Sequence, residues 1–281
     1  MVGVIGLGAM GGAMVGRLLG QGVVPAVWDA QPEVLARAVA AGATPTPAPA
    51  EAVVLLSLPH DGAVAATLAG LWPVLPAGAV IVDTSTISPI AARGFAAQAA
   101  ARGLAYLDAP VSGGPAGAAA GSLTMMIGGE AAALEQARPV LALLTGRLVH
   151  VGASGAGQVA KLVNNLLLAT HLVCAAEALR LGRLAGLPPE ALLPVLNAAT
   201  GRSAATEINW PRWIASGTFD SGFSAGLMRK DARLALELAA AVGAPLDACA
   251  AAVQAWMDAP VPDGAEFNRV PAAIFGVAND P

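Results

Sequence analysis

The segment from Val2 to Asp29 constrains the fold of this chain more than any other. Val2 to Ile5 is an apolar run typical of a buried strand, and it leads into Gly6-Leu7-Gly8-Ala9-Met10-Gly11, a G-x-G-x-x-G turn. The apolar periodicity of residues 9–20 then predicts a helix. In such a turn the first glycine permits the bend, the second lets a phosphate approach the backbone, and the third lets helix and strand pack closely. The segment therefore predicts a strand–turn–helix unit that binds phosphate groups.

An acidic residue, Asp29, ends the next predicted strand, residues 23–28. At this place in a dinucleotide-binding unit, a carboxylate accepts hydrogen bonds from the ribose hydroxyls of NAD and repels the 2′-phosphate of NADP. The next arginine after it is Arg37, so the pattern favours NAD over NADP. Two alternatives stay open. In the first, the turn is a plain glycine-rich connection and Asp29 is a helix cap. In the second, the unit binds another adenosyl cofactor, as in methyltransferases.

Short apolar runs alternate with alanine-rich helical stretches through the first half of the chain. The predicted strands are 2–5, 23–28, 53–58, 80–83, 104–107, 123–127 and 148–151, and the predicted helices are 9–20, 33–41, 62–69, 89–101 and 130–143. Strand–helix alternation of this kind indicates a parallel sheet with helices on both faces. We therefore predict an α/β, Rossmann-type N-terminal domain.

The pattern changes near Gly155. From there to about Gly186 no strand and no proline is evident, which predicts one long helix. Only helical segments follow, interrupted by prolines, and the residues after Pro260 are predicted to be loop-rich. We expect an NAD-binding domain over residues 1–154 and an all-helical substrate and dimerisation domain over residues 155–281, joined through the long helix.

Composition excludes several classes of protein. Apolar residues make up 56% of the chain, yet no uninterrupted apolar run reaches the roughly 20 residues of a membrane span. The net charge of −4 and the lack of a basic stripe argue against nucleic acid as a partner. The N-terminus lacks the basic start of a signal peptide. Cys174 and Cys249 are predicted to be core residues in a reducing cytoplasm, and the histidines have no metal-ligand spacing.

Lysine is rare in this chain. Only Lys161 and Lys230 are lysines among the 15 Lys and Arg residues. Arginine stays protonated in proteins, whereas lysine can be tuned to exchange its proton. The two lysines are therefore candidates for positions where an ammonium group is needed specifically; the alternative is that two lysines remain by chance.

Five ordered motifs give the chain a resemblance to the β-hydroxyacid dehydrogenases, the family of 3-hydroxyisobutyrate dehydrogenase. The glycine turn resembles that family's opening signature, and the segment Asp83 to Pro89 resembles its strand end near the nicotinamide. Asp108 to Gly114 resembles its substrate-binding motif, and Gly157 to Asn165 resembles its catalytic helix. Leu227-Met228-Arg229-Lys230-Asp231 resembles its cofactor-closing motif.

The resemblance implies the roles of individual residues. Lys161 is the implied acid/base, and Asn165, one helical turn later, binds the substrate or orients Lys161. Ser112, Gly113 and Gly114 are implied to hold a substrate carboxylate through the hydroxyl and backbone N–H groups. The implied cofactor contacts beyond the turn and Asp29 are Leu58, Pro59, Thr86 and Lys230.

Structural alternatives stand beside several of these roles. They are an exposed helix-start lysine for Lys161, a strand-ending turn at Ser112, a helix cap at Thr86, a plain loop proline at Pro59 and a salt bridge to a neighbouring acid for Lys230.

We expect hydride transfer between NAD and a small 3-hydroxy acid, or reduction of the matching semialdehyde. An imine reductase that uses NADP is an alternative, but Lys161 and Asp29 count against it, since that class usually lacks the lysine. A non-catalytic nucleotide-binding module is a second alternative. The 6-phosphogluconate dehydrogenases, with much longer chains, fit poorly. The expected partners are a small carboxylate-bearing alcohol or aldehyde and further copies of the chain, as a homodimer or homotetramer.

Overall fold

The computed structural model describes residues 2–276, and the chain divides into two compact units, Met1–Lys161 and Leu162–Pro281. The division falls inside α7 (Ala156–Leu184), a few residues beyond the boundary predicted after residue 154. Each unit has its own hydrophobic core.

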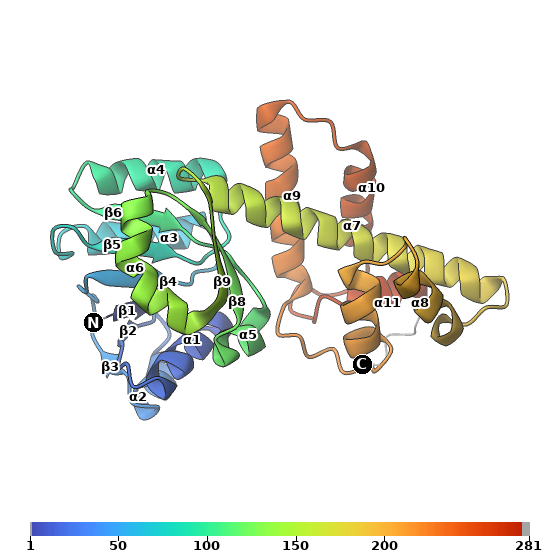
Figure 1. The fold of residues 1–281 in the computed structure, drawn as a ribbon, viewed down its shortest axis with the longest axis horizontal. Helices are drawn as coiled ribbons and strands as arrows, with labels where there is room; N and C mark the ends of the chain where they lie inside the picture. The colour runs from blue at the N-terminus through green and yellow to red at the C-terminus, as the bar shows by residue number, and fades with distance from the viewer. Residues whose placement is uncertain (1, 277–281) are drawn as a thin grey trace. The chain divides into compact units, whose positions relative to one another are not determined.

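The first unit is built on one mixed sheet (Figure 1). Its strands are β1 (Val2–Ile5), β2 (Ala26–Trp28), β3 (Thr44–Pro45), β4 (Val53–Leu56), β5 (Val80–Asp83), β6 (Ala105–Asp108), β7 (Val111–Ser112), β8 (Leu123–Gly128) and β9 (Thr145–Gly152). Their order is β3-β2-β1-β4-β5-β6-β8-β7, and β9 pairs with β8. The run from β3 to β6 is parallel throughout, as the sequence predicted.

The parallel arrangement stops at β8, which is antiparallel to β6 and β7. β7 was not predicted, and neither was α5 (Gly114–Ala120), which follows it. A helix of α5's length advances only about 10 Å. This is too little to carry the chain from the C-terminal ends of the strands back to their N-terminal ends, as a parallel connection requires. β8 therefore starts beside the end of β7, runs back along it and meets the end of β6 only at its last residue, Gly128. The predicted parallel sheet is confirmed from β1 to β6 and does not extend to β8.

Helices cover both faces of this sheet (Figure 1). α1 (Ala9–Gly20), α2 (Pro32–Ala40), α5 and α6 (Ala131–Leu144) share one core, while α3 (Asp61–Leu71) and α4 (Pro89–Ala100) share the other. Side chains alternate between the faces along a strand, so Val4 enters the first core and Ile5 the second. The central strands are buried on both faces, which explains why they read as continuous apolar runs.

The second unit is helical. It contains most of α7, then α8 (Pro189–Ala198), the π-helix η1 (Ala205–Ile214), α9 (Ala225–Val242), α10 (Asp247–Asp258) and α11 (Arg269–Phe275). Trp256 is fully buried at its centre and donates its indole N–H to the Ala169 carbonyl at 3.0 Å. α11 lies in a segment predicted to be loop. Its Pro271 falls in the first turn, where the missing N–H costs no hydrogen bond.

Within residues 2–276, α7 is the one helix long and apolar enough to cross a membrane, and half of that stretch is buried inside the protein. Leu166, Leu172 and Leu179 on this helix are buried, as in the central helix of a folded core. Cys174, on the same helix, is exposed, so the prediction that it is a core residue is wrong.

Candidate functional site

Two glycines of the turn between β1 and α1 are required by the fold itself. Gly6 has a φ of +85°, and a Cβ there would lie 2.2 Å from the Ser57 carbonyl oxygen. A Cβ on Gly11 would lie 1.8 Å from the Gly6 carbonyl oxygen. A side chain on Gly6 would collide with the backbone that follows β4, and one on Gly11 would push α1 away from the turn, so these glycines set the close packing that the motif predicted.

Gly8 differs from both. A Cβ on Gly8 would meet no atom within 4 Å, so the protein's own packing does not require glycine there. Gly8 is exposed at the N-terminal cap of α1, and it offers no side-chain hydrogen bond to the first helical turn. Free backbone N–H groups and the positive end of the helix dipole suit a phosphate. This open, side-chain-free cap fits the pyrophosphate of NAD.

Asp29, just beyond β2, ties the turn to the second strand. Its Oδ2 accepts a hydrogen bond from the Leu7 backbone N–H at 2.6 Å, and its Oδ1 accepts one from the Gln31 N–H at 2.8 Å. A carboxylate has about four acceptor positions, so two backbone bonds leave room for ribose hydroxyls. Asp29 is thus placed beside the glycine turn, as the sequence predicted for a cofactor carboxylate.

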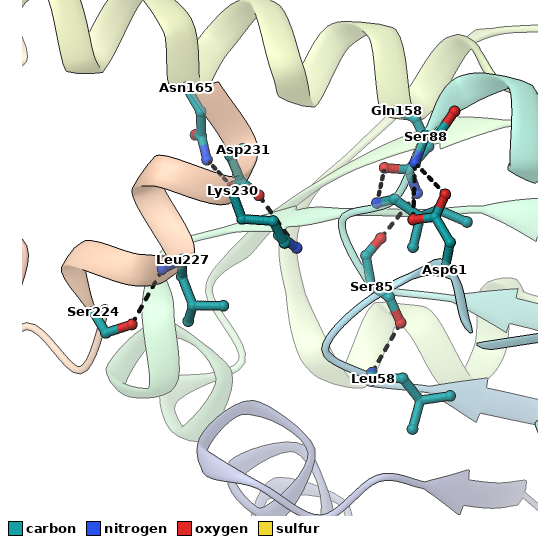
Figure 2. A network of polar contacts seen from close by, with 11 residues as sticks. Leu58, Asp61, Ser85, Ser88, Gln158, Asn165, Ser224, Leu227, Lys230 and Asp231 are labelled. Carbon is teal, nitrogen blue, oxygen red and sulfur yellow. Dashed lines mark hydrogen bonds and ion pairs between the residues drawn. The ribbon is translucent and has the colours of Figure 1, made fainter. Parts of the chain in front are cut away.

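The loops after β4 and β5 are joined by Ser85. Its hydroxyl accepts a hydrogen bond from the Leu58 N–H at 2.9 Å, as Figure 2 shows, and Pro59 beside it is exposed. Thr86 follows Ser85 and is half-buried. The cap of α4 is Ser88, whose hydroxyl accepts from the Ile90 N–H. The capping role offered as an alternative for Thr86 therefore belongs to Ser88.

A buried carboxylate, Asp83, holds the start of this loop. It accepts hydrogen bonds from the Ser85 N–H at 2.9 Å and from the Tyr106 hydroxyl at 2.6 Å. Burial raises the pKa of Asp83 to about 6, although these hydrogen bonds lower it. The neighbouring Asp108 carboxylate adds a smaller rise to the same pKa.

Lys161 lies on α7, and Asp108 at the end of β6 anchors the first turn of this helix to the sheet. The Asp108 carboxylate accepts from the Gly155 N–H at 2.7 Å and from the Gln158 N–H at 3.0 Å. A Cβ on Gly157 would lie 2.5 Å from the Asp108 carbonyl oxygen, so the helix lies directly on the strand end. Lys161 itself is only 8% exposed, which excludes the alternative of an exposed helix-start lysine.

The predicted carboxylate-binding turn lies at the end of β7. Ser112 pairs with Thr124 of β8 and is half-buried. Gly113 and Gly114 have φ values of +127° and +63°, a region that favours glycine, and they form the start of α5. The turn therefore places the backbone N–H groups of Gly113 and Gly114 between the end of β7 and the start of α5.

In the second unit, Asp231 brings two predicted site residues together (Figure 2). Its Oδ2 accepts a hydrogen bond from Asn165 Nδ2 at 2.6 Å, and its Oδ1 lies 3.3 Å from Lys230 Nζ. Asp231 is buried, whereas the Lys230 side chain is 22% exposed. The salt bridge to a neighbouring acid, named as an alternative for Lys230, is therefore present.

Four polar residues of the site had no role in the sequence-based prediction. They are Asp83, Asp108, Gln158 and Asp231, all buried. Each stands inside a motif that the resemblance picked out, but no spacing rule marks a buried carboxylate or amide whose partners lie far away in the sequence. Among residues 2–276, no group of three or more His, Cys, Asp or Glu side chains could hold a metal ion.

Family comparisons cover almost the whole chain. Residues 1–152 match the model of the NAD binding domain of 6-phosphogluconate dehydrogenase. Residues 155–267 match the model described as NAD-binding of NADP-dependent 3-hydroxyisobutyrate dehydrogenase.

Similar proteins agree with these matches. A 2-(hydroxymethyl)glutarate dehydrogenase of Eubacterium barkeri is 42% identical over 90% of this chain and 87% of its own. An NAD-dependent L-serine dehydrogenase of Pseudomonas aeruginosa is 42% identical over 84% of each. The solved structure of Mycobacterium tuberculosis 3-hydroxyisobutyrate dehydrogenase with L-serine superposes with a TM-score of 0.91 at 35% identity, covering 97% of this chain and 98% of that one.

Imine reductases, the alternative class, are more distant. That of Streptomyces aurantiacus is 23% identical with a TM-score of 0.66 over 98% of this chain and 99% of its own, a likeness of fold alone. This chain has the glycine turn and Asp29 that suit NAD, and its relatives include hydroxyacid dehydrogenases. The chain belongs to the β-hydroxyacid dehydrogenase family and is an NAD-dependent hydroxyacid dehydrogenase.

Proposed function

We propose that the substrate is a 3-hydroxypropionate carrying a small substituent at C2, which the enzyme oxidises to the semialdehyde or forms from it. The names of three similar proteins support this, because 3-hydroxyisobutyrate, L-serine and 2-(hydroxymethyl)glutarate share that core and differ at C2. In each, a primary alcohol stands one carbon away from the carbon that bears the carboxylate. The common core predicts one subsite for the carboxylate and one for the reacting CH₂OH group.

Lys161 is the proposed acid/base. When bound, NAD supplies the hydride acceptor at its nicotinamide. The alcohol proton must go to a protein group, and a neutral lysine amine can accept it or return it in the reverse reaction. The observation that carries this role is the burial of Lys161 on a helix whose first turn Asp108 fixes to the sheet. A group held this firmly keeps its position between turnovers.

The proposed substrate contacts come from two places. Ser112, Gly113 and Gly114 bind the carboxylate through the hydroxyl and backbone N–H groups. Asn165, one turn after Lys161 on α7, binds the substrate hydroxyl or carboxylate. Asp231 supports this role because it holds the Asn165 amide in one orientation.

The proposed cofactor contacts follow the ends of the parallel strands. The pyrophosphate binds at the turn from Gly6 to Gly11, that is at Gly6, Leu7, Gly8, Ala9, Met10 and Gly11, and the adenosine ribose binds at Asp29. Leu58, Pro59 and Thr86 line the path toward the nicotinamide. Lys230 contributes a positive charge to the cofactor, and its ion pair with Asp231 sets the direction of its side chain.

The experiment is a substrate panel followed by one variant. NADH formation is measured with 3-hydroxyisobutyrate, L-serine, 2-(hydroxymethyl)glutarate and glycerate, and NADH consumption with the semialdehydes, each also with the NADP pair. Lys161→Ala should lower kcat on the best substrate by roughly 100- to 10,000-fold while NAD binding, measured by calorimetry, stays. A Lys161→Ala enzyme with wild-type turnover would remove the acid/base assignment, and an enzyme inactive with every alcohol and semialdehyde of the panel would remove the substrate class.

We propose further that the enzyme is a cytoplasmic homodimer or homotetramer. Large apolar side chains of the second unit are exposed in the single chain, among them Leu181, Leu184 and Val195 at 71%, 76% and 60%. Exposed apolar side chains of this size favour burial against another copy. Two free cysteines support a reducing compartment. Analytical ultracentrifugation at micromolar concentration tests the assembly, and a monomer there would contradict it.

A further inference from the structure

Gln158, the third residue of α7, clasps the loop that contains Thr86. Its Nε2 donates a hydrogen bond to the Ser85 carbonyl at 2.9 Å, and its Oε1 accepts one from the Ile87 N–H at 3.1 Å (Figure 2). The two backbone groups stand on either side of Thr86. One demands a donor and the other an acceptor, so an amide fits both and no other uncharged side chain of similar length does. Gln158 is fully buried, so water does not substitute for either bond.

The backbone of Gln158 is held as firmly as its side chain. Its N–H donates to Asp108 at the end of β6, and Gly157 before it lies against the same strand end. Lys161 comes three residues later, on nearly the same face of the helix as Gln158. One residue therefore joins three parts of the first unit: the strand end at Asp108, the Thr86 loop and the turn of α7 that leads to Lys161.

The network continues to the other predicted cofactor loop. Ser85, whose carbonyl binds Gln158, accepts a hydrogen bond from the Leu58 N–H through its hydroxyl, and its own N–H binds Asp83. A single hydrogen-bonded path thus runs from Leu58 through Ser85 to Gln158. It connects both loops assigned to the cofactor with the helix assigned to the acid/base.

We propose that Gln158 is a positioning residue for hydride transfer. It fixes the Thr86 loop, and with it the nicotinamide, relative to the helix that carries Lys161. The inference rests on the roles proposed above for Thr86 and Lys161. Gln158 is not one of the proposed substrate or cofactor contacts, and its effect is on the alignment of the groups that are. Misplacement of reacting groups by about 1 Å can cost roughly 100-fold in rate.

The test compares Gln158→Met and Gln158→Glu with a matched control. Methionine keeps the length and removes both hydrogen bonds. Glutamate keeps both bonds while its carboxyl is protonated, which burial favours, and loses the donor for Ser85 once the carboxyl ionises, so this variant is measured over a series of pH values. The control is Gln136→Met, because Gln136 also donates to a backbone carbonyl, that of Gly78, at 2.9 Å, but on the exposed surface of α6. The measurements are kcat, KM, calorimetric NAD affinity and the primary deuterium isotope effect on kcat with a substrate deuterated at the reacting carbon.

Gln158→Met at every pH, and Gln158→Glu once its carboxyl ionises, should lower kcat by about 10- to 100-fold relative to the wild type at the same pH. Both should raise the isotope effect, because hydride transfer becomes rate-limiting. NAD affinity should change by less than about threefold, since the pyrophosphate and ribose contacts stay. Gln136→Met should match the wild type. A loss of activity that only follows the folded fraction, with KM and isotope effect unchanged, would show a purely structural role and overturn the proposal. Wild-type kinetics in both variants would also overturn it.

Lys161→Ala measured in the same series separates this inference from the proposed function. If that variant is inactive while both Gln158 variants behave as the wild type, only the positioning role fails. If Lys161→Ala turns over normally, the acid/base assignment fails and the positioning role falls with it. Should Gln158→Met not fold, Gln158→Glu decides, because it preserves the size of the side chain and its kcat, relative to the wild type, should fall as the pH rises and its carboxyl ionises.

Discussion

The carboxylate of Asp29 accepts a hydrogen bond from the backbone N–H of Leu7 at 2.6 Å, so the end of β2 and the glycine turn after β1 are joined directly. The residue predicted to bind the ribose also holds the turn predicted to bind the pyrophosphate. Losing the side chain therefore changes two things at once, the shape of the turn and the charge beside the ribose. The two effects are separable because asparagine keeps an acceptor oxygen and drops the charge.

Asp29→Ala should weaken NAD binding by roughly 10- to 100-fold, since hydrogen bonds to a charged group contribute about 1.5–3 kcal/mol. NADP binding should weaken less, because the repulsion of its 2′-phosphate disappears too. Asp29→Asn should keep more of the NAD affinity than Asp29→Ala does, and it should still reduce the preference for NAD over NADP. Calorimetric titration with both cofactors measures this, and Glu33→Gln, an exposed charge removed nearby on α2, is the control. Equal losses for NAD and NADP would refute the charge argument.

Gly8→Ala should separate cofactor binding from stability. A Cβ there meets nothing in the protein, so the free energy of unfolding should change by at most about 0.5 kcal/mol. NAD affinity should fall by about tenfold or more, or about 1.4 kcal/mol, because the methyl group fills the space of the pyrophosphate. Gly16→Ala, an exposed glycine inside α1 with equally open surroundings, should stabilise the protein by about 0.5–1 kcal/mol and leave binding unchanged. Wild-type NAD affinity in Gly8→Ala would place the pyrophosphate elsewhere.

Asp83 should give the fold a measurable dependence on pH. Its pKa rises from 3.8 to about 6 in the folded chain, so the folded state binds this proton more tightly. The resulting stability is fully present below 3.8 and is lost as the pH rises through about 6. Asp83→Asn lacks this contribution. The difference in unfolding free energy, wild type minus variant, should therefore grow by roughly 2–3 kcal/mol as the pH falls from about 7 to about 4.

Urea titrations at a series of pH values measure that difference. Tyr106→Phe gives a second check, because it removes a hydrogen bond that lowers the pKa of Asp83. In Tyr106→Phe, the pH range over which the stability contribution of Asp83 is lost should therefore move upward. A difference between wild type and Asp83→Asn that stays flat or shrinks on acidification would contradict the assignment.

Arg229→Lys should destabilise the second unit. The Arg229 guanidinium donates to the carbonyls of Trp256, Ala259 and Val261 and to the Asp263 carboxylate, and so holds the end of α10. A lysine cannot reach these acceptors from one position, and each buried carbonyl left unpaired costs about 1–3 kcal/mol. We expect a loss of about 2–4 kcal/mol in urea unfolding followed by tryptophan fluorescence. Arg138→Lys, which alters an exposed pair with Glu135, should show no measurable change. Similar stability in both variants would refute the prediction.

The strands and helices with regular periodicity could be predicted from sequence to within a few residues. β1, β5 and α1 have the predicted bounds, because their burial patterns depend on local alternation and the glycine turn. β8 was predicted as a strand, but its direction could not be predicted, because the direction of a strand depends on how far the connection before it reaches. The short α5, which forms that connection, was not predicted. The exposure of Cys174 likewise depends on which face of α7 the other helices cover.

The sequence alone determined the NAD-binding turn, the acidic residue beside it and the rarity of lysine that draws attention to Lys161. These features are local, since a turn and the strand after it lie within one stretch of chain. Only the tertiary structure decided what holds Lys161, Thr86 and Asn165 in place. Gln158 finds its partners 71 and 73 residues away, and Asn165 finds Asp231 66 residues away. Such buried hydrogen bonds exist only once the sheet and helices have packed and brought distant polar groups together out of water.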